Sequence, residues 1–221
     1  MIYSLNEIEA LSRKAARGAG MSWGLAEETG KAVRWLCDHG FAGPQLLAGL
    51  LATNDGIAYS KLVPRFANRS LSATSGTLCP IIVGAMISDR AYGLTVDDPL
   101  HIKDISAPLL LAPFVAAASG SGGVTVALEW AGSLLTFDNG RVSVEADQAA
   151  VMTRHATRAV LSKTQSRFTP SPHTLAGRGP GKITTDRHPL SRASHDHASN
   201  ATLRFIPCPA SGKGNKKKTK K

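Results

Sequence analysis

The chain has 221 residues, of which 43% are apolar and 19% are charged. This composition fits a globular domain and excludes collagen, a coiled coil and a wholly disordered chain. The formal net charge of +10 is unevenly distributed: residues 1–160 hold thirteen Lys and Arg against fourteen Asp and Glu, whereas residues 161–221 hold thirteen against two. We therefore expect a nearly neutral domain over 1–160 and a basic tail over 161–221.

Three helices are predicted in the first fifty residues. Ser4 and Glu7 form a capping box that begins the first helix. The second helix begins at Ser22 and ends before Gly40, and Pro44 suits the first turn of the third. The apolar positions expected to be buried in the first helix are Leu5, Ile8, Leu11 and Ala15.

The pattern changes after residue 56 to short apolar runs broken by Pro, Gly and Asp. Strands are predicted at 81–86, 109–117, 124–130 and 134–137. Asp138-Asn139-Gly140 predicts a tight hairpin turn into a strand that contains Val142 and Val144. Asp147 is expected to cap a last helix that reaches residue 160. Helices, then a mostly antiparallel or mixed sheet, then a late helix indicate an α+β fold.

The last 61 residues differ in composition from the rest. They contain six of the twelve prolines and only eight Leu, Ile, Val or Phe, about 13% of the segment. A charged segment with less than roughly 20% of these residues is expected to lack a core. We therefore predict one domain over 1–160 and a disordered tail over 161–221, whose lysine-rich end, residues 213–221, would bind nucleic acid only non-specifically.

No targeting or cofactor signal is found in the sequence. The longest apolar stretch, residues 107–118, is interrupted by two prolines and is too short to span a membrane. The three cysteines form no C-x-x-C pair, and acidic residues stand where a signal peptide would be basic. We expect a cytoplasmic protein with no membrane contact, metal or cofactor, while the residues leave its oligomeric state open.

Three short motifs have simple structural interpretations. Gly20-Met21-Ser22-Trp23-Gly24 matches the G-x-S-x-G pattern of hydrolases, but it follows a helix, so Ser22 is interpreted as a helix cap. Ser119 to Gly123 is expected to be a flexible turn, because a strand and not a helix is predicted after it. His39 is interpreted as a cation at a helix end, where it would suit the helix dipole.

The candidate ligand-binding residues are Arg17, Trp23, Glu27 and Glu28, at the first interhelical turn. A guanidinium and an indole close together can hold an anion or an aromatic ligand. At most one of the two adjacent glutamates can face Arg17. The simpler interpretation makes the glutamates first-turn acids that stabilise the helix dipole and makes Trp23 a packed aromatic residue.

The segment from Arg13 to Glu28 resembles an uncharacterised bacterial family, a domain of unknown function. The resemblance continues through Leu78-Cys79-Pro80, Pro108-Leu109-Leu110-Leu111 and Glu129-Trp130, and so implies family structure over about residues 1–160. It implies no activity, substrate or site residue. Because residues 173–182 and the lysine-rich end depart from the family pattern, one hypothesis is that the tail is an aberrant extension, such as a frameshift produces.

Three functions are consistent with the sequence. The first is a non-catalytic binding or accessory protein for a small ligand or a protein partner. The second is a small-molecule enzyme in which Arg17 anchors an anion and Glu27 or Glu28 transfers a proton. The third is non-specific nucleic-acid binding by the tail. The sequence favours the first, because it contains no paired histidine and carboxylate, metal cluster or cofactor loop.

Overall fold

The first three helices begin where their capping residues predict. In the computed structural model they are α1 (Leu5–Gly18), α2 (Trp23–Asp38) and α3 (Gly43–Thr53). Ser4 accepts from the Glu7 amide and completes the capping box, while Ser22 caps α2 by accepting from Leu25. The structure describes residues 3–74, 76–90, 98–139, 141–164 and 175–176, all within Met1–Thr184, the first of the two units into which the chain divides.

The buried face of α1 differs from the prediction. Ser12 and Ala16 are buried, whereas Leu11 is 41% exposed and Ala15 is exposed. The reason is the close approach of α2: a Cβ atom at Gly30 would lie 2.8 Å from the carbonyl oxygen of Glu9. Small residues at this contact bring the backbones together and turn the longer Leu11 side chain outward.

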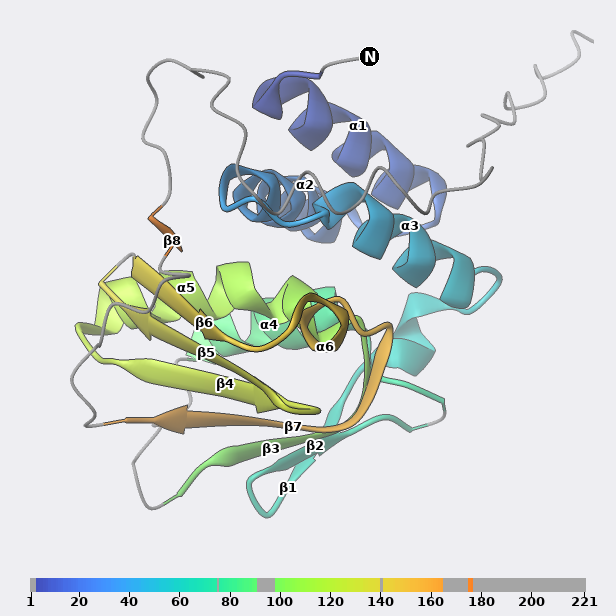
Figure 1. Cartoon of the computed structure of the whole chain (residues 1–221). Coiled ribbons are helices and arrows are strands. Elements are labelled where there is room, and N and C mark those ends of the chain that lie inside the picture. The colour runs from blue at the N-terminus through green and yellow to red at the C-terminus, as the bar shows by residue number, and fades with distance from the viewer. Residues whose placement is uncertain (1–2, 75, 91–97, 140, 165–174, 177–221) are drawn as a thin grey trace, which may run out of the picture. The chain divides into compact units, whose positions relative to one another are not determined.

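The remaining elements are strands with short helices between some of them, and Figure 1 shows their arrangement. They are η1 (Tyr59–Leu62), β1 (Arg65–Ala67), β2 (Ser70–Ser72), α4 (Pro80–Arg90), β3 (Leu100–Ser106), η2 (Pro108–Leu111), α5 (Ala112–Gly122), β4 (Val126–Trp130), β5 (Ser133–Asp138), β6 (Arg141–Glu145), α6 (Gln148–Val151), β7 (His155–Lys163) and β8 (Leu175–Ala176). The α+β fold class is thus confirmed.

The sheet is mixed, with strand order β1-β2-β3-β7-β4-β5-β6-β8. Only β2 and β3 pair in parallel, and every other neighbouring pair of these strands is antiparallel. The hairpin of β5 and β6 is confirmed, with Asp138 opposite Arg141 and Asn139 at a φ of 45°. Within the described sheet, β7 lies between β3 and β4, although it comes late in the sequence.

Two predicted strands are helices. Residues 81–86 lie in α4, and residues 109–117 lie in η2 and α5. These segments are apolar on most sides: α4 and α5 pack against each other, α2 contacts both, and β4 and β5 contact α5. A short helix that is buried on all sides has no polar face, so its sequence shows no helical period. Its run of apolar residues is then easily mistaken for a buried strand.

The predicted helix over 147–160 is confirmed only at its beginning, where the Asp147 carboxylate accepts from the Ala150 amide at 2.6 Å and caps a short helix. Only α6, four residues long, is helical there, and β7 follows it. In β7, Ala156, Ala159 and Leu161 are buried. The boundary predicted after residue 160 falls inside β7, which continues to Lys163. The rest of the predicted tail, apart from 164 and β8, lies outside the described residues.

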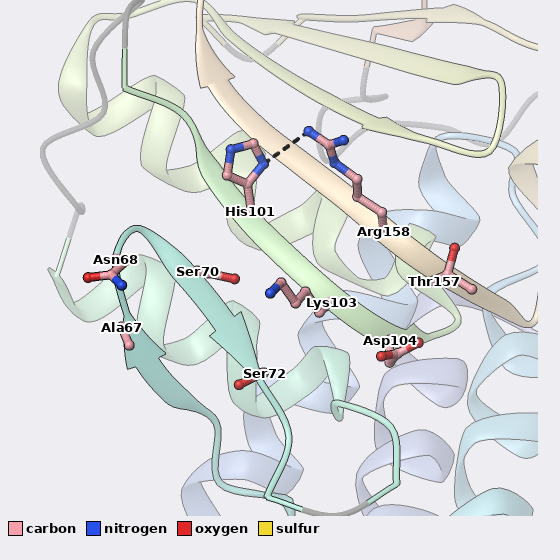
Figure 2. Close-up of a pocket in the computed structure, with 9 residues that line it drawn as sticks. All are labelled: Ala67, Asn68, Ser70, Ser72, His101, Lys103, Asp104, Thr157 and Arg158. Carbon is pink, nitrogen blue, oxygen red and sulfur yellow. Dashed lines mark hydrogen bonds between the residues drawn. The ribbon is translucent and has the colours of Figure 1, made fainter.

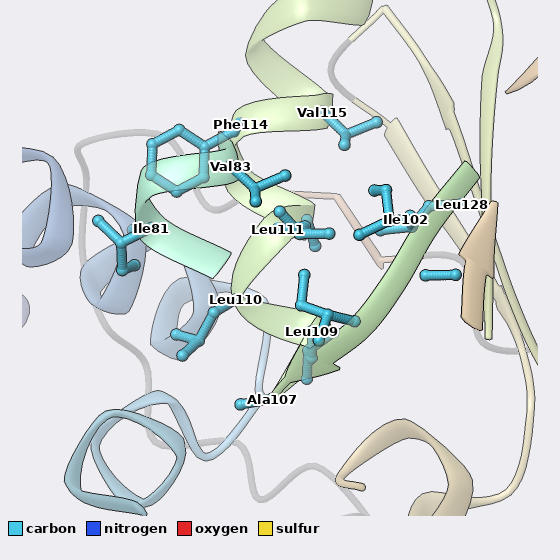
Figure 3. Packing of buried hydrophobic residues seen from close by; sticks show 14 of the residues in the cluster. Ile81, Val83, Ile102, Ala107, Leu109, Leu110, Leu111, Phe114, Val115 and Leu128 are labelled. Carbon is cyan, nitrogen blue, oxygen red and sulfur yellow. The ribbon is translucent and has the colours of Figure 1, made fainter. Parts of the chain in front are cut away.

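The core lies between the sheet and the helix pair α4 and α5. Leu109, Leu110 and Leu111 of η2 are fully buried, and Figure 3 shows them among side chains of α4, α5 and the sheet. Ile102 of β3 and Leu128 of β4 face this layer. Since side chains alternate along a strand, the residues beside Ile102 point to the opposite face of the sheet. That face is the one that carries polar groups.

Candidate functional site

The structure brings two of the four predicted site residues together at the α1–α2 turn. The Arg17 guanidinium carbon lies 4.6 Å from the centroid of the Trp23 ring. Arg17 also donates through Nη1 to the carbonyl oxygen of Met21. Trp23 is 67% exposed, so it is not the packed aromatic of the simpler interpretation. The guanidinium therefore already has two partners within its own turn.

The two glutamates are not joined to this pair. Glu28 forms an ion pair with Lys31 at 2.7 Å, and Glu27 is exposed. Across the described ranges, no ion pair connects Arg17 with either glutamate. Both follow the first turn of α2, which holds no acid, so their interpretation as first-turn acids is wrong. Among the four predicted site residues, the contact that the structure shows is therefore that of Arg17 with Trp23.

His39 differs from its predicted role. It is 5% exposed, and its ring stacks on Trp35 with centroids 3.8 Å apart. Its Nδ1 lies 2.8 Å from the Trp35 carbonyl oxygen, an acceptor, so Nδ1 carries the proton. Burial lowers the pKa of His39, because a second proton would sit on the buried Nε2 atom. The interpretation of His39 as a cation is therefore wrong.

The segment Ser119 to Gly123, predicted to be a flexible turn, is the end of α5. Gly123 adopts a φ of 60° as the cap of that helix, a conformation that glycine takes easily. The Ser119 hydroxyl is fully buried and lies 2.5 Å from the Val124 carbonyl oxygen and 3.1 Å from that of Phe137. A serine held in this way anchors α5 to β5, and no ligand loop is formed.

A groove that the sequence did not predict lies on the face of the sheet opposite α4 and α5. It has a volume of about 650 Å³, and β2, β3 and β7 form it. We call it the basic groove, because His101 and Lys103 of β3 and Arg158 of β7 line it. Its other lining residues are Ala67, Asn68, Ser70, Ser72, Asp104 and Thr157. Figure 2 shows the β3 side chains between the β2 serines and the β7 side chains.

The basic side chains of the groove are positioned by strand register. Lys103 and Arg158 are direct partners across the antiparallel β3–β7 pair. Arg158 donates through Nη2 to Nδ1 of His101 at 3.3 Å. Because Nδ1 accepts this bond, the neutral His101 imidazole carries its proton on Nε2. Three nitrogen-bearing side chains from two strands are thus held in one place.

Asp104 gives the basic groove one acidic end. Its Oδ1 atom lies 3.8 Å from Nε2 of His155, at the beginning of β7. Asp104 has a φ of 50°, and its carbonyl oxygen accepts from the Leu78 amide at 2.7 Å. The lining of the groove therefore holds one carboxylate together with the Lys103 and Arg158 cations.

Sequence reasoning missed the groove because it did not predict β3 and placed residue 158 in a helix. A signal was present: His101 and Lys103 alternate with Leu100 and Ile102, as expected for a strand with one buried face.

Within the residues that the structure describes, no group of three or more His, Cys, Asp or Glu could hold a metal ion. None of the described helices has the length and apolar character needed to cross a membrane.

Comparison with known proteins gives one match. Residues 3–79 match the model of a family described as "Protein of unknown function (DUF3726)". This confirms the resemblance to a domain of unknown function for that segment, which is shorter than the expected 1–160. No curated protein and no solved structure matches the chain. The matched segment contains β1 and β2, whereas β3 and β7 lie beyond it.

Proposed function

We propose that the protein is a non-catalytic binding protein that holds a compact anion with two or more negative charges in the basic groove. The observation that carries this proposal is the cross-strand pair of Lys103 and Arg158. Like charges directly opposite each other destabilise antiparallel strands. In the described part of the chain neither residue has an ion-pair partner. An anion between them would neutralise both charges.

The groove also supplies hydrogen-bond donors around that position. His101 presents its Nε2 proton, since Nδ1 is occupied by Arg158. The Ser70 hydroxyl is shielded from solvent and has no hydrogen-bond partner among the described residues. Thr157 lines the opposite side of the groove. Charge-assisted bonds from arginine and lysine, supported by hydroxyl donors, suit a phosphate group or a dicarboxylate.

The same residues support binding more than catalysis. Among the described side chains, no carboxylate lies within ion-pair distance of His101, and Asp104 faces His155 instead. General acid–base chemistry usually orients its histidine with such a group. No Phe, Tyr or Trp lines the groove, so it lacks the large aromatic side chains on which single-stranded binding proteins stack successive bases.

We further propose that the protein is located in the cytosol. Cys37 and Cys79 are free thiols, which supports a reducing compartment. Measured fractionation of the tagged full-length protein tests this location, and recovery with the membrane or secreted fraction would contradict it.

The test is a titration of the ¹⁵N-labelled full-length protein with inorganic pyrophosphate, followed by amide chemical shifts. We expect the largest shifts at residues 68–72, 101–104 and 157–158. Replacement of Arg158 by Gln removes a charged donor, and hydrogen bonds to charged groups contribute roughly 1.5–3 kcal/mol, so affinity should fall about ten- to hundred-fold. Lys14→Gln is the matched control, because Lys14 is exposed on α1, away from the groove.

Two results would contradict the proposal. Shifts confined to residues 185–221 would assign the binding to the lysine-rich tail, the alternative nucleic-acid-binding segment. Equal affinity of Arg158→Gln and Lys14→Gln for pyrophosphate would show that Arg158 acts only through the overall positive charge of the protein and does not bind the anion in the groove. Added salt should weaken binding in either case, so salt dependence alone does not distinguish the groove from the tail.

A further inference from the structure

A second concave site, separate from the basic groove, lies beside α3. It is a cleft of about 420 Å³ between α3 and the residues at the end of β3 and the beginning of β7. We call it the α3 cleft. Leu46, Gly49 and Leu50 form its α3 wall, and Ala107 and Met152 lie on the opposite wall. The volume falls within the range of small-molecule sites.

Gly49 leaves this cleft open. It lies inside α3, and a Cβ atom at this position would meet nothing within 4 Å. Glycine inside a helix destabilises it by roughly 1 kcal/mol relative to alanine. The neighbouring Leu46 and Leu50 side chains are 5% and 2% exposed. The helix therefore presents a gap beside an apolar wall.

The polar residues that line the cleft are Gln45, Thr53, Ser106 and Arg154. Arg154 lines the cleft and is exposed, and no described carboxylate lies within ion-pair distance of it. Ser106 is 4% exposed, and its hydroxyl lies 2.8 Å from the Thr77 hydroxyl. Each hydroxyl has one proton and only one proton is used between them, so the pair retains one donor. The Arg154 guanidinium and the Ser106 hydroxyl thus stand beside apolar side chains.

From this arrangement we infer that the α3 cleft binds a small carboxylic acid with an apolar body. The carboxylate pairs with the Arg154 guanidinium, whose fork of N–H groups matches two oxygen atoms. The apolar body packs on Leu46, Leu50 and Met152. A single cation beside apolar walls favours a monocarboxylate, in contrast to the multiply charged anion proposed for the basic groove. The two sites are independent, because no residue lines both.

The experiment titrates the ¹⁵N-labelled full-length protein with hexanoate, and separately with acetate and 1-hexanol. Hexanoate should shift the amides of residues 45–53, 106–107 and 152–154. Acetate lacks the apolar body and 1-hexanol lacks the charge, so each should bind at least about tenfold more weakly. Equal binding of hexanoate and 1-hexanol would overturn the inference that Arg154 recognises a carboxylate.

Two variants test the cleft by different means. Arg154→Gln should weaken hexanoate binding about ten- to hundred-fold and leave pyrophosphate binding unchanged. Gly49→Leu places a side chain in the open space and should abolish hexanoate binding, while circular dichroism and thermal unfolding verify the fold. Arg13→Gln is the control, since Arg13 is exposed on α1. Unchanged affinity in either cleft variant, or shifts that map to the basic groove, would overturn the inference.

Discussion

Replacement of Gly84 by alanine tests the packing of α4 on α5. A Cβ atom at Gly84 would lie 2.3 Å from Cδ2 of Phe114 and 2.5 Å from its Cγ. Phe114 is 4% exposed and belongs to the central cluster of buried residues (Figure 3). At these distances the atoms overlap, so either the buried ring must shift or the two helices must move apart.

The expected loss follows from two opposing contributions. Overpacking of a filled core costs roughly 1–3 kcal/mol, and an approach as short as this one indicates the upper part of that range. Alanine recovers about 1 kcal/mol, because glycine is the poorer helix former. We therefore expect Gly84→Ala to lower the free energy of unfolding by roughly 1–2 kcal/mol, measured by urea denaturation with circular dichroism.

Gly49→Ala is the matched control, since Gly49 is helical and a Cβ atom there meets nothing within 4 Å. This variant should raise the free energy of unfolding by up to about 1 kcal/mol. If Gly84→Ala were as stable as Gly49→Ala, the described contact between α4 and α5 would be wrong.

Three further variants test other parts of the structure. Gly30→Ala should destabilise the α1–α2 contact, because its Cβ atom would lie 2.8 Å from the Glu9 carbonyl oxygen, and urea denaturation measures the loss. Burial lowers the pKa of His39 below its ordinary 6.5, so the free energy of unfolding should decrease by up to about 1.4 kcal/mol per pH unit as the pH falls below 6.5. His39→Gln should lose that part of the pH dependence between pH 7.5 and 5.5, and an identical dependence would refute the assignment. Deletion of residues 185–221, which hold nine Lys and Arg against two Asp, should weaken oligonucleotide binding in a fluorescence anisotropy titration, and unchanged affinity would exclude a tail-driven mechanism.

The parts of the fold that the sequence predicts correctly depend on local interactions. Ser4 and Ser22 cap their helices through amides three residues away, so the sequence alone locates both helix starts. The hairpin at Asn139 is equally local, because the turn residues themselves favour the required backbone angles. These elements need no knowledge of the distant chain.

The parts that the sequence does not predict depend on distant contacts. Ile81 and Leu110 are in helices, but they are surrounded by other elements, so no polar face reveals the helical period. Ala159 is in a strand because β3 and β4 pair with β7 on both sides. Tertiary pairing here overrides the helical spacing of small apolar residues.

The candidate sites follow the same division. Arg17 and Trp23 are close in sequence, and their contact could be predicted. Lys103 and Arg158 are far apart in sequence, and they meet only because β7 crosses back between β3 and β4. The basic groove therefore becomes visible only when the strand order is known.

The most direct test of the basic groove is urea denaturation of the wild type and Lys103→Gln, each with and without inorganic pyrophosphate. Without the anion, Lys103→Gln should be more stable by roughly 0.2–1 kcal/mol, because its repulsion with Arg158 is removed. With pyrophosphate at a hundred times its dissociation constant, the wild type should gain about 2.7 kcal/mol and the variant much less. Equal gains in both proteins, or a less stable variant without the anion, would contradict the proposal that this charge pair exists to bind an anion.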